Sequence, residues 1–210
     1  MPFLKKKETP AGVIGIWQIA ESSTELLPTV QLSESEKKSP GIIKNEKRKR
    51  EFLAVRALIK KIIDTDSTII YENSGRPRLK NSKKNISISH SAELAVVFLS
   101  DRNAGIDVEN TNRNIAPLVK RFLLKEELEQ TENSSDKQLM QTIYWSAKEA
   151  IFKCTSEEKI LFNRQIHIHP FTLNNEGNFR GELKIKNRTF YFDISYFRVG
   201  NNVVVYCVEM

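Results

Sequence analysis

Two short runs of residues have the types and spacing that chemistry requires. The first is Gly105-Ile106-Asp107-Val108-Glu109, in which apolar residues alternate with two carboxylates. Alternate side chains of an extended strand share one face, so Asp107 and Glu109 would lie together with Cα atoms about 7 Å apart. Carboxylates at this spacing suit a hard divalent cation such as Mg2+.

The second run is Trp145-Ser146-Ala147-Lys148-Glu149-Ala150-Ile151-Phe152-Lys153. Apolar residues recur at helical spacing over residues 136–154, which predicts an amphipathic helix with Asp136 as its N-cap. Glu149 lies off the apolar stripe, on a face that also carries Trp145 and Phe152. Two large aromatics on a face expected to be solvated predict a second buried contact there.

Each run also has a simpler explanation. Acidic residues are common at strand ends, and Glu149 with Lys153 is the i,i+4 pair that stabilises exposed helices by a few tenths of a kcal/mol. Three carboxylates, a lysine one turn after Glu149 and the preceding His90 are harder to explain in this way together. Because Mg2+ prefers one or two carboxylates plus substrate phosphate oxygens, the set indicates a metal site for a phosphate ester.

These runs occur in order with two others, "GRPRL" at Gly75–Leu79 and "SISHS" at Ser87–Ser91. The four motifs, between about Lys47 and Lys153, resemble the 4'-phosphopantetheinyl transferases, and most of all the surfactin-synthetase-activating type. The resemblance implies an α+β fold of two similar halves, related by a pseudo-two-fold axis, with antiparallel sheets packed against long helices. It also implies an active site between the halves.

A faint internal repeat agrees with two halves. Residues 54–60 align with residues 147–153, and Gly15–Ile19 aligns with Gly105–Glu109. We therefore expect an N-terminal half, residues 1–103, with the coenzyme A adenosine and phosphate contacts, and a C-terminal half, residues 104–210, with the metal site and catalytic residues. In the first half the metal carboxylates are replaced, which predicts one metal site. The replacing residues are Trp17, Ile19 and Arg56.

The resemblance also implies roles for single residues. Asp107, Glu109 and Glu149 would bind Mg2+, and Lys153 would contact the pyrophosphate of coenzyme A as a point charge. The reaction would transfer the 4'-phosphopantetheine arm of coenzyme A to a serine of an apo acyl or peptidyl carrier protein and release 3',5'-ADP. Which carrier and which pathway it serves stays open.

Basic residues of the first half would hold the 3'-phosphate and adenosine end of coenzyme A. Arg76 matches through Gly75-Arg76-Pro77, and His90 would donate to a phosphate oxygen. Arg50 is the third expected contact, with Arg48 or Arg56 as the alternative under a small shift of alignment.

The carrier serine is a weak nucleophile that benefits from a nearby base. In "RFLLKEELE" the resemblance implies Glu127 as a catalytic residue beside Glu149 and Lys153, with Glu126 or a water as alternatives to Glu127. After Lys153 the chain continues Cys154-Thr155, whereas the family continues with small residues and glycines. The role of this loop toward pantetheine is therefore open.

The charge and composition of the chain limit the classes of partner that it could bind. A net charge of +7 and a pI near 9.3 indicate an anionic partner, and residues 44–50 hold the densest basic cluster. A basic nucleic-acid-binding module is one alternative, but no helix-turn-helix, zinc-finger or aromatic-basic strand pattern accompanies the charge. Coenzyme A and an acidic carrier suit it equally well. A metal-dependent phosphodiesterase is a third candidate and predicts hydrolysis without an acceptor.

The apolar pattern also predicts a helix near residues 115–129, and alternation predicts strands over residues 165–172, 179–185, 189–197 and 203–208.

The remaining signals are simpler. No apolar run approaches the roughly 18 residues of a membrane span, and the start lacks a signal-peptide segment, so we expect a soluble, cytoplasmic protein with no membrane partner. Because two unequal halves of one chain could form the active-site cleft by themselves, we expect a monomer. Cys154 and Cys207 are expected to be core thiols. His167 and His169 would share one face of a strand, but no third ligand is near in sequence, so we expect them to be structural.

Overall fold

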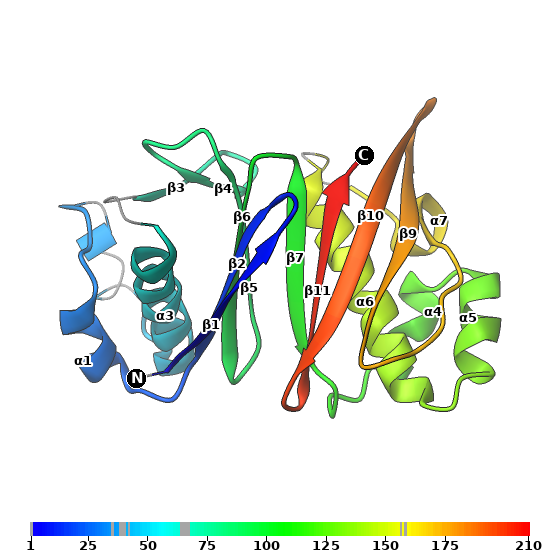
Figure 1. Ribbon diagram of the computed structural model, residues 1–210, viewed down its shortest axis with the longest axis horizontal. Coiled ribbons are helices and arrows are strands. Elements are labelled where there is room, and N and C mark those ends of the chain that lie inside the picture. Colours follow the sequence, from blue (N-terminus) through cyan, green and yellow to red (C-terminus); the bar gives the residue numbers. More distant parts are fainter. Residues whose placement is uncertain are drawn as a thin grey trace. The chain divides into compact units, whose positions relative to one another are not determined.

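The computed structural model describes residues 2–34, 36–37, 41, 43–63, 68–155, 157 and 159–210. The chain divides into two compact units, Met1–Asp101 and Arg102–Met210. Each unit has an antiparallel sheet with a long helix packed on it (Figure 1), which confirms the predicted α+β class. Within the described residues, no helix is both long and apolar enough to cross a membrane.

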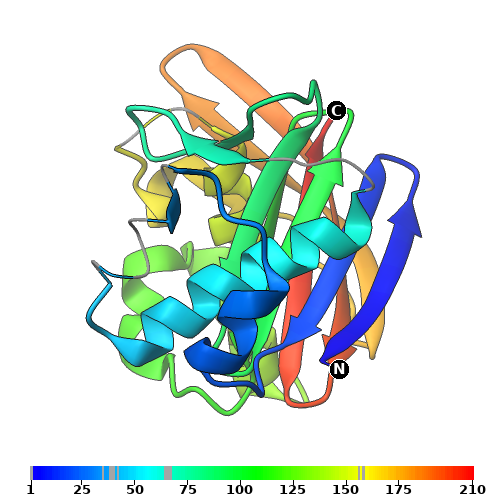
Figure 2. The ribbon, with the colours of Figure 1, turned by 90° about the vertical axis from the view of Figure 1, so that its left-hand side faces the viewer.

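Unit 1 is built on a six-stranded sheet in the order β1-β2-β6-β5-β4-β3. Helix α3 (Glu46–Ile62) packs on this sheet (Figure 2), and Leu53 and Leu58 of the helix are fully buried. The Asn45 side chain caps α3 by accepting from the Arg48 N–H, at 3.0 Å. The strands and short helices are β1 (Phe3–Thr9), β2 (Gly12–Gln18), α1 (Ser23–Leu26), η1 (Leu27–Thr29), β3 (Ile69–Tyr71), β4 (Pro77–Leu79), β5 (Asn85–His90) and β6 (Leu94–Ser100).

Unit 2 is built on a five-stranded sheet in the order β7-β11-β10-β9-β8, packed against helix α6 (Lys137–Cys154). Asp136 caps α6 as predicted, because its Oδ1 accepts from the Leu139 N–H at 3.0 Å. Ile143 and Ala147 of the apolar stripe are fully buried in the core of this unit. The other elements are β7 (Ala104–Asn110), η2 (Ala116–Leu118), α4 (Val119–Phe122), α5 (Lys125–Glu132), α7 (Phe162–Gln165), β8 (Ile166–Ile168), β9 (Glu176–Ile185), β10 (Arg188–Val199) and β11 (Asn202–Glu209).

The two units share one connectivity. A strand, a long helix and four more strands follow each other as β2, α3, β3, β4, β5, β6 in unit 1 and as β7, α6, β8, β9, β10, β11 in unit 2. The corresponding strands have the same order in each sheet, and β1 is an additional edge strand of unit 1. The segments aligned by the predicted repeat, Gly15–Ile19 with Gly105–Glu109, fall largely on β2 and β7.

Two predicted elements differ from the structure. The single helix expected near residues 115–129 is divided into η2, α4 and α5, because Leu123 and Leu124 are extended. The Leu124 N–H donates to Glu127 Oε2 at 2.8 Å, which starts α5 and orients the Glu127 side chain. The strand expected over residues 165–172 is shortened to β8, because α7 extends to Gln165 and because Pro170 has no N–H to continue the ladder of hydrogen bonds.

Candidate functional site

A glycine sets the close approach of α6 to β7. A Cβ atom added at Gly105 would lie only 1.9 Å from the carbonyl oxygen of Ala150 on α6. Side chains alternate along a strand, so Asp107 and Glu109 share with Gly105 the face that α6 covers. Glu149 of the helix, which directly precedes Ala150, is therefore held beside the carboxylates of β7 by a contact that only glycine allows.

Asp107 is buried, and its carboxylate is paired with Lys153. Lys153 Nζ lies 2.8 Å from Asp107 Oδ1 and donates also to the Ile106 carbonyl oxygen at 3.0 Å. The lysine predicted to meet substrate phosphate thus contacts one of the carboxylates predicted to hold a cation.

Glu109 is held by two donors. Its Oε1 accepts from Arg113 at 2.6 Å and from the Trp145 indole N–H at 3.1 Å. Burial, followed by the charge of Asp107, nevertheless raises the pKa of Glu109, against the opposite effect of Arg113.

Glu149 is the most strongly perturbed of the three carboxylates. Burial raises its pKa to about 7, and the charges of Asp107 and Glu109 add to the effect, which Lys153 and Arg113 partly offset. A carboxylate in such surroundings is only partly ionised near neutral pH, and a further positive charge would favour its ionised form.

The three carboxylates have the donor chemistry of a Mg2+ site, because they offer hard oxygen atoms whose mutual repulsion a divalent cation would relieve. In the described part of the chain, however, the ligand atoms of these three carboxylates do not all lie within 4.8 Å of one another. Lys153 and Arg113 instead supply the positive charge next to Asp107 and Glu109.

The aromatic face of α6 has the second buried contact that the sequence predicts. The Trp145 ring meets the Phe122 ring edge-on, with centroids 5.1 Å apart, and lies 6.0 Å from the ring of Phe162. Phe152 is 5.8 Å from the same Phe162 ring. Packing against α4 and α7 therefore fixes the indole that donates to Glu109.

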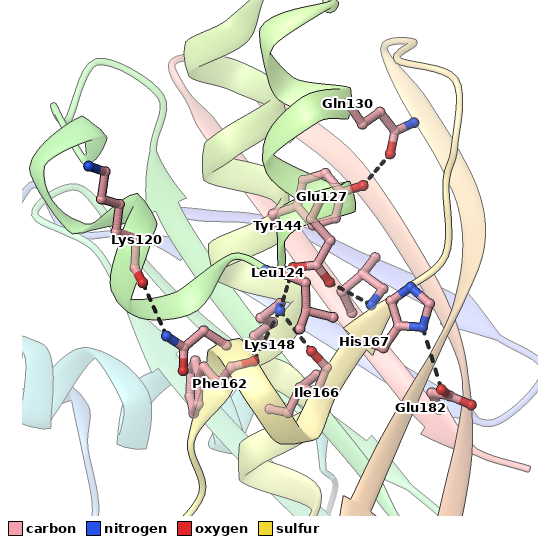
Figure 3. A network of polar contacts seen from close by, with 12 residues as sticks. Lys120, Leu124, Glu127, Gln130, Tyr144, Lys148, Phe162, Ile166, His167 and Glu182 are labelled. Atoms are coloured by element: carbon pink, nitrogen blue, oxygen red, sulfur yellow. Dashed lines mark hydrogen bonds and ion pairs between the residues drawn. The ribbon is translucent and has the colours of Figure 1, made fainter.

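Glu127 lies in a buried ion pair that the sequence did not reveal. Glu127 Oε2 lies 2.6 Å from Lys148 Nζ, and the two side chains are 1% and 0% exposed. Lys148 Nζ donates as well to the carbonyl oxygens of Phe162 and Ile166, at 3.1 and 2.8 Å. Figure 3 shows these three contacts converging on the lysine nitrogen.

The second oxygen of Glu127 is also engaged. Glu127 Oε1 accepts from the Ile168 N–H at 2.8 Å, so the carboxylate links α5, α6 and β8. Burial lowers the pKa of Lys148, although Glu127 opposes this effect. A signal was present in the sequence: Lys148 lies four residues after Tyr144 and three before Ile151, in the apolar stripe, where a cation requires a buried partner. Glu126, the neighbouring alternative, is exposed.

In unit 1, Arg50 and His90 both contact neighbouring polar groups. Arg50 Nη2 donates to the Ile19 carbonyl oxygen at 2.8 Å, and its Nε is buried. His90, at the end of β5, places Nδ1 3.5 Å from Oε2 of the buried Glu51. The sequence missed Glu51, whose position beside Arg50 in α3 was the available signal.

The surroundings of Arg48, Arg50 and Arg56, the three alternatives for the phosphate contact, differ. Arg56 is 8% exposed, and its Nε donates to Glu36 Oε1 at 3.1 Å while its guanidinium stacks on the Phe52 ring. Arg48 is exposed on the first turn of α3, and Arg50 is half-buried. Arg56 is therefore engaged inside unit 1, whereas Arg48 and Arg50 are the two accessible candidates.

Arg76 lines a basic pocket of unit 1 with a volume of about 130 Å3. Three other cationic side chains, Arg78, Lys83 and Lys84, line it too, with Glu72 as the one acidic lining residue. Arg78 pairs with Glu72 at 3.3 Å, and Lys84 pairs with Asp101 at 3.1 Å. Such a pocket suits a phosphate group.

The comparisons with known proteins address the family. No curated protein matches this sequence significantly. The family model of the 4'-phosphopantetheinyl transferase superfamily matches residues 103–207, which is half of the 210-residue chain and includes all three carboxylates, Lys148 and Lys153. The match to this superfamily supports phosphopantetheine transfer in general, and therefore a transferase role. With its α+β architecture and the matched unit 2, the chain belongs to the 4'-phosphopantetheinyl transferase superfamily.

Proposed function

We propose that the protein transfers the 4'-phosphopantetheine arm of coenzyme A to a serine of an apo acyl or peptidyl carrier protein, in a Mg2+-dependent reaction. The observation that carries the proposal is the approach of α6 to β7 at Gly105, which brings Glu149 beside Asp107 in the segment matched to the superfamily. The surfactin-synthetase-activating type is proposed from the motif order.

Asp107, Glu109 and Glu149 are the proposed ligands of Mg2+. The raised pKa values of Glu109 and Glu149 support this assignment, because burial and then the charge of Asp107 disfavour their ionised forms, which a bound cation would stabilise. When bound, Mg2+ supplies charge neutralisation for the pyrophosphate oxygens of the substrate. Lys153 adds a cation that can exchange its contact with Asp107 for a phosphate oxygen.

The basic residues of unit 1 are proposed to hold the 3'-phosphate and adenosine end of coenzyme A. Arg76 contributes through the basic pocket that it lines, Arg50 through its half-buried guanidinium, and His90 through an exposed imidazole. Glu51 would position His90, because its carboxylate lies within 3.5 Å of Nδ1.

In the proposed reaction, the serine Oγ attacks the β-phosphorus of coenzyme A and forms a new P–O bond. The bond to the leaving 3',5'-ADP breaks, and the serine proton passes to a base. We propose Glu149 for this base as well as for a metal ligand, since a carboxylate has two oxygens. Lys153 contacts the phosphates and stabilises the charge on the departing oxygen.

For Glu127 we propose a positioning role. Its oxygens accept from Lys148 and from two backbone N–H groups, and its side chain is 1% exposed, so proton transfer from a carrier serine would first require breaking a buried ion pair. The arrangement supports a function in holding α5, α6 and β8 together around the helix that carries Glu149.

The experiment that tests this function is mass spectrometry of apo carrier proteins after incubation with coenzyme A and Mg2+. Modification adds one phosphopantetheine group to a carrier serine, and chelation of Mg2+ should prevent it. Glu149→Gln should lose the activity, whereas Glu129→Gln, which changes a 65% exposed carboxylate on α5, should keep it. Coenzyme A cleavage without acceptor modification would indicate a phosphodiesterase, and tight duplex binding at physiological salt would indicate a nucleic-acid-binding module.

We also propose that the protein acts in the cytoplasm and as a monomer. Two units of one connectivity within one chain supply both groups of residues, which supports the monomer. Sedimentation of the active enzyme checks this. Activity that is lost on dilution together with a larger species would contradict it.

A further inference from the structure

Two histidines and a carboxylate meet on unit 2, apart from the carboxylates of β7. His167 on β8 and Glu182 on β9 are directly paired across the two antiparallel strands. His169, two residues further along, has its side chain on the same face as His167. Ile166 and Ile168 point to the opposite face and are buried in the core, so the two imidazoles lie on the face of β8 directed away from the core.

The three side chains are close enough to share an ion. One ligand atom from each of His167, His169 and Glu182 lies within 4.8 Å of the other two. The imidazole rings have centroids 5.2 Å apart at 40°, and His167 Nδ1 lies 3.4 Å from Glu182 Oε1, a contact drawn in Figure 3. All three residues are half-buried, which limits the number of side-chain conformations that compete with the clustered one.

The ligand set determines the class of ion. A tetrahedral Zn2+ with bonds of about 2.0–2.1 Å holds its ligands about 3.4 Å apart, so side-chain rotations of about 1 Å at the ligand atoms would complete three sides of such a site. Two imidazoles and one carboxylate suit Zn2+ and related transition metals, whereas Mg2+ prefers oxygen ligands alone. The cluster and the carboxylates of β7 therefore have different ion preferences.

We propose that His167, His169 and Glu182 form a binding site for a divalent transition-metal ion of the Zn2+ class, with a fourth position open to water or another donor. The site is independent of the proposed transferase function. Lys184 competes with the ion, because its Nζ lies 2.7 Å from Glu182 Oε1 and must withdraw when the ion binds.

An ion bound at this cluster would affect the placement of β8. β8 has three residues and lies at the edge of its sheet. Its backbone supplies the Ile166 carbonyl oxygen to Lys148 and the Ile168 N–H to Glu127, both at 2.8 Å. An ion joining β8 to β9 on the other face would hold this short strand in the register that the buried ion pair requires.

The test is calorimetric titration of the purified full-length protein, free of affinity histidines, with Zn2+ in buffer containing excess Mg2+. We expect saturable binding of one Zn2+ and a rise in Tm. His167→Asn, His169→Asn and Glu182→Gln should each weaken binding by at least about tenfold, since even the loss of an outer-sphere partner of a metal site costs about 10–100-fold in affinity. Lys184→Met should strengthen binding, because it removes the competing cation.

Asp193→Asn is the matched control, since it removes a 59% exposed carboxylate of β10 outside the cluster and should leave the Zn2+ affinity unchanged. Circular dichroism establishes that each variant is folded, and Co2+ absorption spectra report the ligand set independently of affinity. Absence of saturable binding, or binding that survives unchanged in the folded His167→Asn and His169→Asn variants, for example at the buried Cys154 and Cys207, would overturn the proposal.

Discussion

Lys153 Nζ and Asp107 Oδ1 lie 2.8 Å apart, so a cation from the chain itself stands next to the most buried of the three clustered carboxylates. The pair is 26% and 7% exposed at its side chains, an intermediate setting in which the attraction is stronger than at an open surface. Glu149 has no comparable described ion pair, and its pKa is raised by burial first and then by the charges of Asp107 and Glu109. We therefore expect an added divalent cation to stabilise the ionised form of Glu149.

Removing any of the three carboxylates should abolish most transfer. We expect Asp107→Ala, Glu109→Ala and Glu149→Gln each to lower kcat/KM by at least about a hundredfold, because a lost metal ligand costs several kcal/mol of charge stabilisation. Carrier modification measured by mass spectrometry checks this, with far-ultraviolet circular dichroism to establish the fold. Full activity in any two folded variants at saturating Mg2+ would refute the assigned site.

Gly105→Ala should disturb both stability and activity. The new Cβ would lie 1.9 Å from the Ala150 carbonyl oxygen, which is backbone and cannot rotate away, so α6 must shift from β7. We expect a loss of about 1–3 kcal/mol in the free energy of unfolding and a fall in kcat, since Glu149 moves with the helix. Gly41→Ala, where a Cβ meets nothing within 4 Å, is the control. Equal effects of the two substitutions in urea denaturation would contradict this account of the packing.

The pKa of Glu149 predicts a pH dependence of stability in the metal-free protein. Its folded pKa of about 7 exceeds the ordinary value of 4.5, so the folded state binds the proton more tightly than the unfolded state. The free energy of unfolding should therefore fall as pH rises from about 4.5 to about 7, by on the order of 3 kcal/mol from this group.

Urea denaturation over this pH range, with a chelator present, measures the effect. Glu149→Gln should flatten the profile, and added Mg2+ should flatten it in the wild type by pairing the ionised carboxylate. A wild-type profile that rises over this interval, and that the Gln variant reproduces, would show that Glu149 is not the group responsible.

The buried pair of Glu127 and Lys148 should be strongly coupled. Lys148→Met leaves the Glu127 carboxylate buried without its cation and is expected to cost about 3–5 kcal/mol of stability. Glu127→Gln leaves the Lys148 ammonium group buried without its carboxylate and is expected to cost a similar amount. The double variant should be more stable than the sum of the two losses predicts, which a double-mutant cycle in denaturant measures. Additive losses would mean that the two side chains act separately.

Arg76 should serve coenzyme A rather than the carrier. We expect Arg76→Ala to raise the KM for coenzyme A by about 10- to 150-fold, equivalent to a charge-assisted contact of about 1.5–3 kcal/mol, with a smaller change for the carrier. Arg188→Ala, which removes an exposed cation outside the basic pocket, controls for net charge. Salt should weaken carrier recognition through screening. An unchanged coenzyme A KM, or a larger effect on the carrier KM, would remove Arg76 from the proposed substrate site.

Local patterns predicted the framework of this protein because they depend on residues close in the chain. The 3.6-residue spacing over residues 136–154 and the Asp136 cap predicted α6, and alternation predicted β7, β9, β10 and β11. The motif order led to the superfamily that the match to residues 103–207 shows. The break between α4 and α5 was not predicted. Leu123 and Leu124 fit the apolar pattern of a helix as well as they fit an extended segment, so the pattern does not reveal the break.

Contacts between distant residues required the tertiary structure. Nothing local to Glu127 shows that Lys148 lies within 2.6 Å of it, and nothing near His167 and His169 shows that Glu182 comes from the next strand. The sequence by itself determined which residues could do chemistry and on which elements they lie, since periodicity and caps are local. Only the tertiary structure decided which charges face each other, because pairing across strands and helices follows from packing.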